Sequence, residues 1–209
     1  MVDKQVWIYQ FVGKLSAEER RKIITCSMFL KEKFDANGVF EKLKSRLVAH
    51  GNQQPKENVK ASSPTVDITS VFVLAAVAAY ENNRVSTIDI GGAFLEAKMT
   101  GENVYLRLDK LMVQLLEEID PTSIPYVDDK GELVAKLDKA LYGCLQASLL
   151  WYNRLSDVLV AYNLTGSRRM MSTSVFILRE KVLGDALYVF MWMTYWLSMR
   201  FSVFCFRAP

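Results

Sequence analysis

Two extended segments separated by a short polar turn stand out in the pattern of apolar and polar positions. Residues 28–34 and 39–48 are rich in apolar positions, and the sequence Asp-Ala-Asn-Gly lies between them. Asn37-Gly38 at such a place favours a β-hairpin, because both residue types tolerate positive φ. The second arm carries Lys42, Lys44 and Arg46. Lys44 and Arg46 lie two positions apart, and such side chains share one face of a strand. The pattern therefore predicts a hairpin with basic side chains on one face.

The rest of the chain alternates between strand-like and helix-like periodicity. Strands are predicted at residues 85–90, 104–108, 133–137 and 175–178. Helices are predicted after a capping box at 16–19, at 68–80 with Asp67 as N-cap, at 111–119 and at 146–162. This mixture predicts an α+β fold with a mixed or antiparallel sheet and packed helices. We expect strands 85–90 and 133–137 in one sheet, with helices 68–80 and 146–162 on it.

Asp89 is a candidate functional carboxylate, because it stands at the end of the apolar strand predicted at 85–90. A carboxylate in that position costs free energy unless it is paired or binds a cation. Gly91-Gly92 follows and lets the chain bend at once. A strand-end cap or an ion-pair partner is the alternative interpretation of Asp89.

Composition and charge narrow the class of protein. About half of the residues, 51%, are apolar, so the chain can bury a core. The net charge is +3, and its basic excess lies in the first third, which hints at a polyanionic partner. The three cysteines are too widely spaced for a metal or disulfide pattern, which fits a reducing intracellular compartment, cytoplasmic or nuclear. The polar N-terminus does not have the pattern of a signal peptide.

Four stretches, in the same order and spacing, resemble motifs of the copia-type retrotransposon reverse transcriptase. They are Lys-Ser-Arg-Leu-Val-Ala-His-Gly at 44–51, Ser-Pro-Thr-Val at 63–66, Ile-Asp-Ile-Gly-Gly-Ala-Phe-Leu at 88–95, and Lys-Ala-Leu-Tyr-Gly at 139–143 with Trp151 beyond it. The resemblance covers roughly residues 20–180 and implies a partial polymerase with fingers and palm. We expect a fingers-like basic hairpin region at 1–60, a partial palm at 61–186 and an apolar tail at 187–209.

The resemblance also implies an RNA-directed DNA polymerase that uses Mg²⁺, an RNA template, a DNA primer and dNTP. Two Mg²⁺ ions in such enzymes are held by carboxylates and substrate phosphates. By resemblance, Asp89 would be the first catalytic and metal-binding carboxylate, and Ile90 would offer a backbone carbonyl. Phe94 would lie against the sugar and exclude a ribose 2′ hydroxyl.

Four further residues acquire roles from the same resemblance. Lys44 and Arg46 would contact the triphosphate, and Tyr142 and Gly143 would line the nucleotide and template pocket. From the residues alone, Lys44 and Arg46 would be a solvated strand face, Phe94 a core residue and Tyr142-Gly143 an ordinary turn. The chain departs from the family after Gly143, where Cys-Leu-Gln-Ala-Ser replaces the usual Leu-Lys-Gln-x-Pro. The missing basic residue and proline weaken the case for a working template pocket.

The sequence Tyr-Val-Asp-Asp at 126–129 spells the signature of these enzymes, but it lies in the wrong place. In the family, the catalytic hairpin follows the Leu-Tyr-Gly motif, whereas here Asp128 and Asp129 precede it. Pro125 and Gly131 flank them, which predicts an exposed polar turn well away from Asp89.

The missing signature is present in another reading frame near residue 190. Met and Trp each have a single codon, so residues 190–196, Phe-Met-Trp-Met-Thr-Tyr-Trp, nearly fix the nucleotides as TTY-ATG-TGG-ATG-ACN-TAY-TGG. Skipping two nucleotides gives Tyr (or His)-Val-Asp-Asp. Loss of one nucleotide upstream, or gain of two, would therefore place the chain out of frame from about Leu187.

Four functions stay open at this point. The first is a degenerate reverse transcriptase fragment without activity. The second is an active nucleotidyltransferase that uses Asp89 with Asp128 and Asp129. The third is a nucleic-acid-binding remnant without chemistry. The fourth is a membrane-anchored protein, because residues 186–206 are apolar and long enough to cross a bilayer, although Arg200 opposes this.

Overall fold

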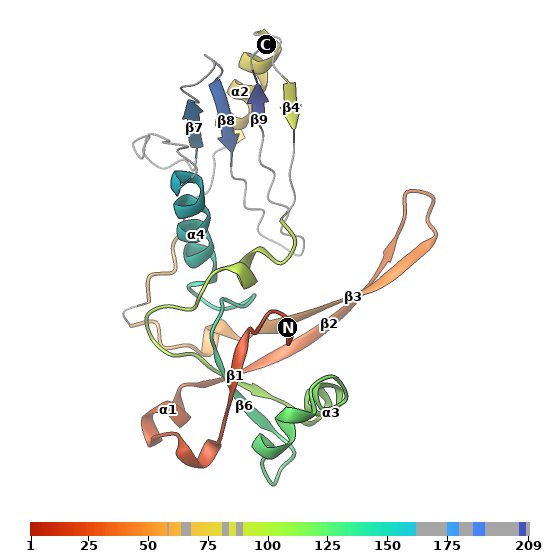
Figure 1. Ribbon diagram of the computed structural model, residues 1–209, viewed down its shortest axis with the longest axis vertical. Coiled ribbons are helices and arrows are strands. Elements are labelled where there is room, and N and C mark those ends of the chain that lie inside the picture. Colours follow the sequence, from red (N-terminus) through yellow and green to blue (C-terminus); the bar gives the residue numbers. More distant parts are fainter. Residues whose placement is uncertain are drawn as a thin grey trace. The chain divides into compact units, whose positions relative to one another are not determined.

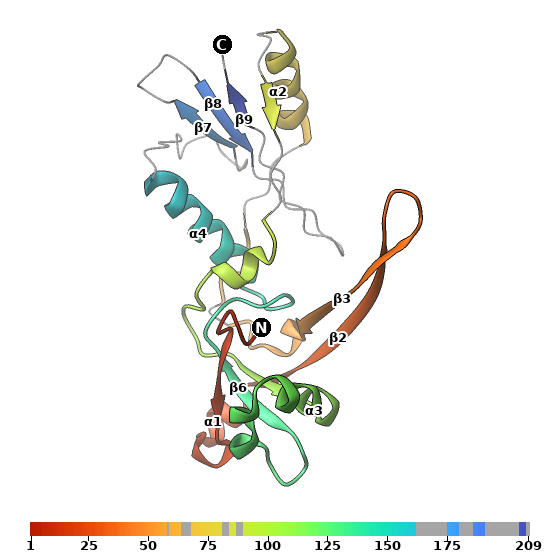
Figure 2. The ribbon, with the colours of Figure 1, turned by 45° about the vertical axis from the view of Figure 1, so that its right-hand side comes forward.

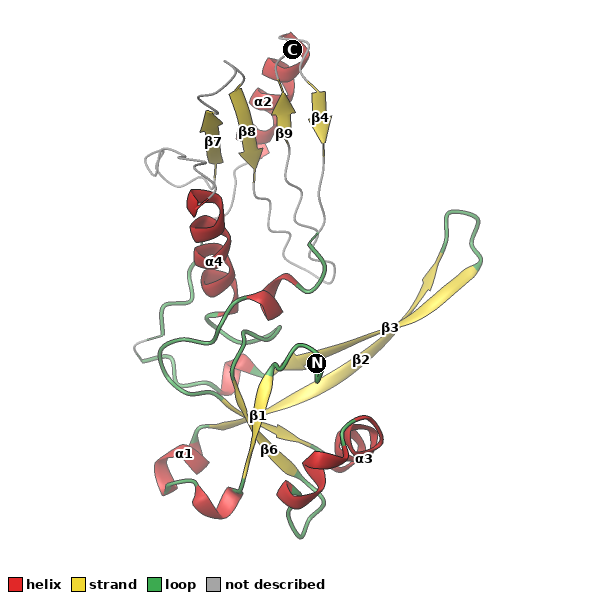
Figure 3. Ribbon diagram, viewed as in Figure 1, coloured by secondary structure: helices red, strands yellow, loops and turns green. Residues whose placement is uncertain are grey.

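The computed structural model describes residues 1–57, 59–63, 68–80, 84–86, 90–161, 175–179, 186–190 and 205–207. The chain forms two compact units. The first contains Met1–Ala61 and Phe94–Trp151, and the second contains Ser62–Ala93 and Tyr152–Pro209. Helices and strands are mixed along the chain, which confirms the predicted α+β class (Figure 3).

A mixed five-stranded sheet is the centre of the first unit (Figure 1). Its order is β1-β6-β5-β2-β3, and its strands are β1 (Trp7–Gln10), β2 (Ile23–Phe34), β3 (Phe40–Ala49), β5 (Tyr105–Leu108) and β6 (Leu133–Leu137). The pairs are antiparallel except β2 with β5, which is parallel. Strand β6 has the predicted bounds, whereas β1 was not predicted, and β2 begins five residues earlier than expected.

Helices and short 3-10 turns complete the first unit around the sheet. The α-helices are α1 (Ala17–Arg21) and α3 (Lys110–Ile119), and the 3-10 turns are η1 (Val12–Lys14), η2 (Gly51–Gln53), η3 (Ala93–Glu96) and η4 (Pro121–Tyr126). Ser16 and Glu19 form the predicted capping box before α1. Asp109 caps α3 by accepting a hydrogen bond from the backbone N–H of Met112, 2.9 Å away.

The core of the first unit lies where the central strands meet α3 and the loop after β6. Ile24, Leu106, Leu133, Leu137 and Leu141 are almost completely buried. The buried side of α3 contributes Met112, Val113 and Leu116. Burial of several large aliphatic side chains at about 1.5–3 kcal/mol each stabilises this arrangement.

Strands β2 and β3 continue past the sheet as a two-stranded ribbon, which projects away from it in both Figure 1 and Figure 2. Only residues 23–25 of β2 pair with β5, so the outer part of the hairpin has no further strand beside it in the described sheet. The predicted hairpin is confirmed, and its turn is longer than a two-residue Asn-Gly turn. Gly38 has a positive φ of +80°, whereas the φ of Asn37 is not positive. The Asp35 carboxylate accepts hydrogen bonds from the backbone N–H groups of Asn37 and Val39.

The second unit contains α2 (Ile68–Tyr80), with the predicted bounds, and two strand pairs. Strand β4 (Arg84–Ser86) pairs with β9 (Cys205–Arg207), and β7 (Val175–Arg179) pairs with β8 (Ala186–Phe190). Helix α4 (Ala147–Ala161) fits the prediction for 146–162 within one residue at each end. The predicted N-cap Asp67 lies outside the described residues.

One prediction about the sheets is wrong. Strand β4 and strand β6 belong to different sheets, because β4 pairs with β9 and not with the central strands. The predicted strand at 85–90 is also shorter in the structure. Strand β4 ends at Ser86, residues 87–89 lie outside the described part, and Ile90 belongs to no strand. Periodicity showed the two strands, but it carried no information about which strands pair.

None of the helices in the described part of the chain is both long and apolar enough to cross a membrane. The apolar segment at 186–206 contributes β8 and part of β9, and its residues 191–204 lie outside the described part.

Candidate nucleic-acid interface

The two faces of the ribbon differ in chemistry, because the register of β2 and β3 sorts their side chains. Facing pairs on one side are Phe29 with Arg46, Lys31 with Lys44, and Lys33 with Lys42. We call these six residues the basic face. Pairs on the other side are Met28 with Leu47, Leu30 with Ser45, and Glu32 with Leu43, and we call that side the apolar face. The predicted sharing of one face by Lys44 and Arg46 agrees with this register.

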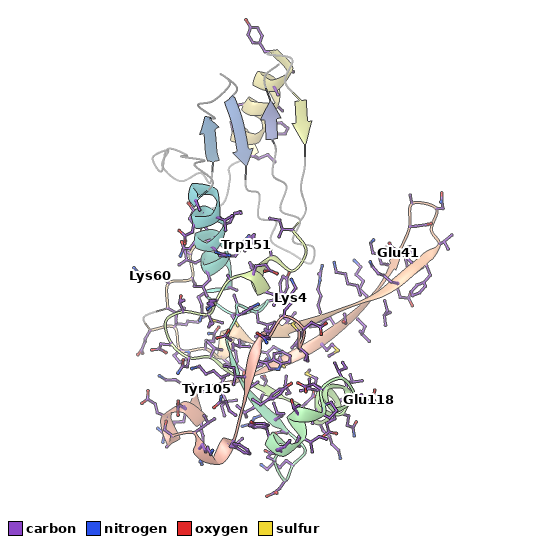
Figure 4. All side chains as sticks on the ribbon, in the orientation of Figure 1. Lys4, Glu41, Lys60, Tyr105, Glu118 and Trp151 are labelled. Atoms are coloured by element: carbon purple, nitrogen blue, oxygen red, sulfur yellow. The ribbon has the colours of Figure 1, made fainter. Side chains whose placement is uncertain are left out.

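The charge on the basic face is only partly offset by acidic side chains. Glu41 is the extra residue of a bulge, because Lys33 pairs with Lys42 and Phe34 pairs with Phe40. Its carboxylate forms ion pairs with Lys33 and Lys42, and Figure 4 shows Glu41 on the outer part of the ribbon. Among the ion pairs of the described residues, none includes Lys31 or Lys44. Two lysines directly opposite one another destabilise a strand pair unless an anion lies between them.

The base of the ribbon lies directly on the loop that follows β6. The backbone N–H of Ala49 donates to the carbonyl oxygen of Tyr142 at 2.7 Å. Gly143 has φ +91°, and a Cβ built there would lie 2.0 Å from the Ala49 carbonyl oxygen. A Cβ on Gly51 would lie 2.1 Å from the Gly143 carbonyl oxygen. Both positions need glycine because two backbone segments, far apart in the sequence, approach one another there.

Buried amides and one imidazole hold the same junction together. Gln54 is buried, and its side chain accepts from the backbone N–H of Leu145 at 2.8 Å and donates to Gln146 at 3.1 Å. The two ring nitrogens of His50 lie 2.7 Å and 2.8 Å from the hydroxyls of Thr25 and Ser27. His50 therefore ties the end of β3 to β2, which explains this histidine without a catalytic role.

Tyr142 joins a second predicted site residue at this junction. Its ring centroid lies 5.0 Å from that of Phe94, which is 2% exposed. Cys144 stands two residues further on, and burial raises the pKa of its thiol to about 12. The thiol therefore remains neutral near pH 7. Tyr142 itself is half-buried, and Gly143 is exposed.

The remaining two predicted site residues are Asp89 and Ile90, and Ile90 belongs to the second unit. Ile90 is half-buried, and Asp89 lies outside the described residues. Within the described ranges, no three His, Cys, Asp or Glu side chains lie close enough together to hold a metal ion.

Asp128 and Asp129 lie in the polar turn predicted for them. The backbone N–H of Gly131 donates to the Asp128 carbonyl oxygen, and Gly131 has φ +77°. The Asp128 carboxylate accepts from the backbone N–H groups of Lys130 and Glu132, each at 2.9 Å, so its own turn uses it. This turn lies before β6, and the Tyr142-Gly143 loop lies after β6. Strand β6, which is about 17 Å long, therefore separates the turn from the loop.

Sequence reasoning missed most of the basic face. Phe29, Lys31 and Lys33 of β2 were not singled out, and Lys42 was noted on the second arm but not assigned to the face of Lys44 and Arg46. The alternation Phe-x-Lys-x-Lys at 29–33 was a usable signal, once the turn fixed which residues of β2 face which residues of β3. The close approach of Gly51 to Gly143 had no signal in a single sequence.

The fold and this face define an α+β domain with a candidate surface for a polyanion. Residues 8–189 match the family described as reverse transcriptase (RNA-dependent DNA polymerase). Two Arabidopsis thaliana proteins, the retrovirus-related Pol polyproteins from transposons RE2 and RE1, are each 31% identical over 76% of this chain. The corresponding polyprotein from transposon TNT 1-94 of Nicotiana tabacum is 28% identical over 66% of it. No solved structure matches the chain.

The chain therefore belongs to the reverse transcriptase family, and its relatives are Pol polyproteins of copia-type transposons. This confirms the resemblance found in its motifs. The chain spans only 9–10% of the length of these three relatives.

Proposed function

We propose that this chain is a piece of a reverse transcriptase domain that holds nucleic acid on the basic face of the ribbon and does not polymerise. The observation that carries the binding proposal is the pairing of Lys31 with Lys44 on a projecting ribbon, where neither lysine forms an ion pair with another described residue. Clustered cations on an exposed surface attract phosphates and release the counterions of the nucleic acid. Residues 1–60 would serve as the fingers and 61–186 as a partial palm.

The ligands follow from the family. The chain would hold an RNA template with a DNA primer inside the cell, with dNTP as the nucleotide substrate of the intact enzyme. Lys44 and Arg46 would contact phosphates, and Tyr142 and Gly143 would line the pocket for nucleotide and template. Asp89, with Ile90 and Phe94 near it in the sequence, would be the remnant of the site that holds Mg²⁺ in the family. Carboxylates at such a site bind the metal and position the substrate oxygens.

Two observations support the loss of polymerisation. The Asp-Asp pair of the Tyr-Val-Asp-Asp sequence at 126–129 lies in a polar turn, where the Asp128 carboxylate accepts hydrogen bonds from the backbone of the turn itself. The match to the family ends at residue 189, next to the place where the signature lies in another frame. The alternative of an active enzyme that uses Asp128 and Asp129 needs both to leave that turn, so we favour the inactive remnant.

Replacing Lys44 and Arg46 together with alanine should weaken binding to an RNA–DNA primer–template on the order of tenfold near 0.1 M salt. The logarithm of the binding constant falls linearly with the logarithm of the salt concentration, and each lost phosphate contact should make this slope shallower by about 0.7–0.9. The slope of the double variant should therefore be shallower than the native slope by about 1.5. Fluorescence anisotropy of a labelled primer–template across a salt series measures both quantities.

A matched control removes one lysine and one arginine elsewhere. Arg21 and Lys130 are exposed, lie outside the ribbon, and take part in none of the ion pairs of the described residues. Their double alanine variant has the same net charge as the ribbon variant, and it should bind with nearly the native salt slope. Equal slopes for the native chain and the ribbon variant would show that the hairpin is only a structural element.

A further inference from the structure

The apolar face of the ribbon ends at its tip in two phenylalanines, which we call the tip pair. Phe34 stands two positions after Glu32 on β2, so both side chains lie on one side of the strand. Phe40 faces Phe34 across the ribbon, and their ring centroids lie 6.1 Å apart. Phe34 and Phe40 are 51% and 54% exposed, so the apolar face carries two aromatic rings at its outer end.

The other end of the apolar face leads into a cavity of about 550 Å³ in the first unit. Met28 and Leu47 line this cavity from the ribbon, and Leu115 and Ile119 line it from α3. Helix α3 lies beside the base of the ribbon in both Figure 1 and Figure 2. Most of the lining side chains are apolar, and the polar ones are Asp3, Lys4 and Ser45. A cavity in the range of about 300–1,000 Å³ holds a drug-sized ligand, so this one has room for two aromatic rings.

Exposed apolar surface connects the cavity to the tip pair. Phe34 stands six positions after Met28 on β2, which corresponds to about 20 Å along an extended strand. Leu30 and Leu43 lie between them and are exposed. Glu32 is the one charged residue among the six that define the apolar face. A small molecule in the cavity would leave most of this length uncovered, so a protein surface fits it better.

The area of this surface is close to that of one side of a stable protein interface. The ribbon contributes side chains that are each about half exposed, namely Met28, Leu30, Phe34, Phe40 and Leu43. At about 200 Å² for a large, fully exposed side chain, they offer on the order of 500 Å². Leu115 and Ile119, 42% and 70% exposed, add about 200 Å² on the same basis. Two such surfaces in contact would bury about 1,400 Å², whereas a specific interface needs about 1,000 Å² in total.

We propose that this surface binds the same surface of a second copy of the chain, with the tip pair of each copy in the cavity of the other. A two-fold contact of this kind needs a self-complementary surface. The tip pair and the cavity meet that need, because they lie at opposite ends of one face. Near the two-fold axis, Glu32 of each copy would accept a hydrogen bond from the Ser45 hydroxyl of the other.

The charge on the ribbon also favours this orientation. The basic face carries Lys31, Lys33, Lys42, Lys44 and Arg46, so two copies that met through it would repel one another. Successive side chains of a strand point to opposite sides, so contact through the apolar faces turns both basic faces outward. The dimer would then hold nucleic acid on two outer surfaces.

Sedimentation equilibrium of the full chain should show a reversible dimer, with twice the 23.8 kDa mass of one chain. The double substitution Leu30→Lys and Leu43→Lys should raise the dimer Kd by about tenfold or more, because it places like charges against one another. Ile8→Lys with Ile124→Lys is the matched control. Ile8 and Ile124 are exposed to a similar degree, lie outside the ribbon and do not line the cavity, so this variant should dimerise like the native chain. Circular dichroism verifies that both variants fold.

Cross-linking tests the exchange of the tip pair. A mixture of Phe34→Cys and Ile119→Cys chains, treated with a short bismaleimide above the dimer Kd, should give more cross-linked dimer than either chain alone. Each residue would lie far from its own counterpart but close to the other residue across the interface. A mixture of Ile8→Cys and Ile119→Cys chains is the control, and it should give no more than the native chain, whose own cysteines set the background.

Three results would overturn the proposal. A chain that remains monomeric at every concentration would assign the surface to a different protein. A dimer or larger assembly that persists unchanged in the Leu30→Lys and Leu43→Lys variant would place the contact elsewhere on the chain. Equal cross-linking in the Phe34→Cys and Ile119→Cys mixture and in its control would show that the tip pair does not enter the cavity of the other copy.

Discussion

Replacing Gly143 with alanine should lower the free energy of unfolding by about 2–5 kcal/mol. Two costs add: a left-handed backbone costs alanine about 1–2 kcal/mol, and overpacking costs a further 1–3 kcal/mol. The added Cβ would meet the Ala49 carbonyl oxygen at 2.0 Å and Cγ1 of Val48 at 2.8 Å. The Ala49 backbone cannot move away easily, because its N–H donates to the carbonyl oxygen of Tyr142, the residue before Gly143.

Gly101 separates the two costs. Its φ is +89°, almost that of Gly143, but a Cβ there has no neighbour within 4 Å. Gly101→Ala should therefore show only the conformational cost, about 1–2 kcal/mol. Urea unfolding of both variants and the native chain, followed by circular dichroism, measures the difference. Equal destabilisation by the two substitutions would mean that the junction between Ala49 and Gly143 is not tightly packed.

The Gly143 junction also shows why part of the site was beyond prediction from the sequence. Tyr142-Gly143 was selected by resemblance to a motif, and from the residues alone it was an ordinary turn. The need for glycine comes from Ala49, 94 positions earlier in the chain, and no local pattern reports such a contact. The same holds for Gln54, whose amide meets Leu145 and Gln146.

Local signals were sufficient where an element depends on its own residues. The capping box at Ser16, the bounds of α2 and β6, and the turn at Asp128–Gly131 all follow from short-range chemistry. Strand β1 was missed because its four residues gain their stability from pairing with β6, which is distant in the chain. The first residues of β2 were missed for a similar reason, since they pair in parallel with β5.

The chain as it stands should show no primer extension above a metal-free control. Catalysis by this family's chemistry needs several carboxylates that converge on one small volume, where they hold the metal ions that contact the substrate oxygens. The sequence from Phe190 to Phe206 contains no acidic residue, so the tail cannot replace the missing Asp-Asp pair. The Asp128 carboxylate is held by its own turn, at the far end of β6 from the Tyr142-Gly143 loop.

We predict that restoring the reading frame just before Phe190 is necessary for any activity, and we make no claim that it is sufficient. The repaired gene would encode Tyr (or His)-Val-Asp-Asp after the strand that here is β8. If the repaired chain extends a primer on an RNA template with Mg²⁺, Asp89→Asn in that chain should abolish the activity. Asp129→Asn should leave it unchanged, because Asp129 lies in an exposed turn. Two results would instead assign catalysis to the Tyr-Val-Asp-Asp sequence at 126–129. One is primer extension by the unrepaired chain, and the other is loss of primer extension when Asp129→Asn is introduced into the repaired chain. A repaired chain that binds primer–template but does not extend it would point to the changed loop after Gly143, where buried Cys144 begins the sequence that departs from the family.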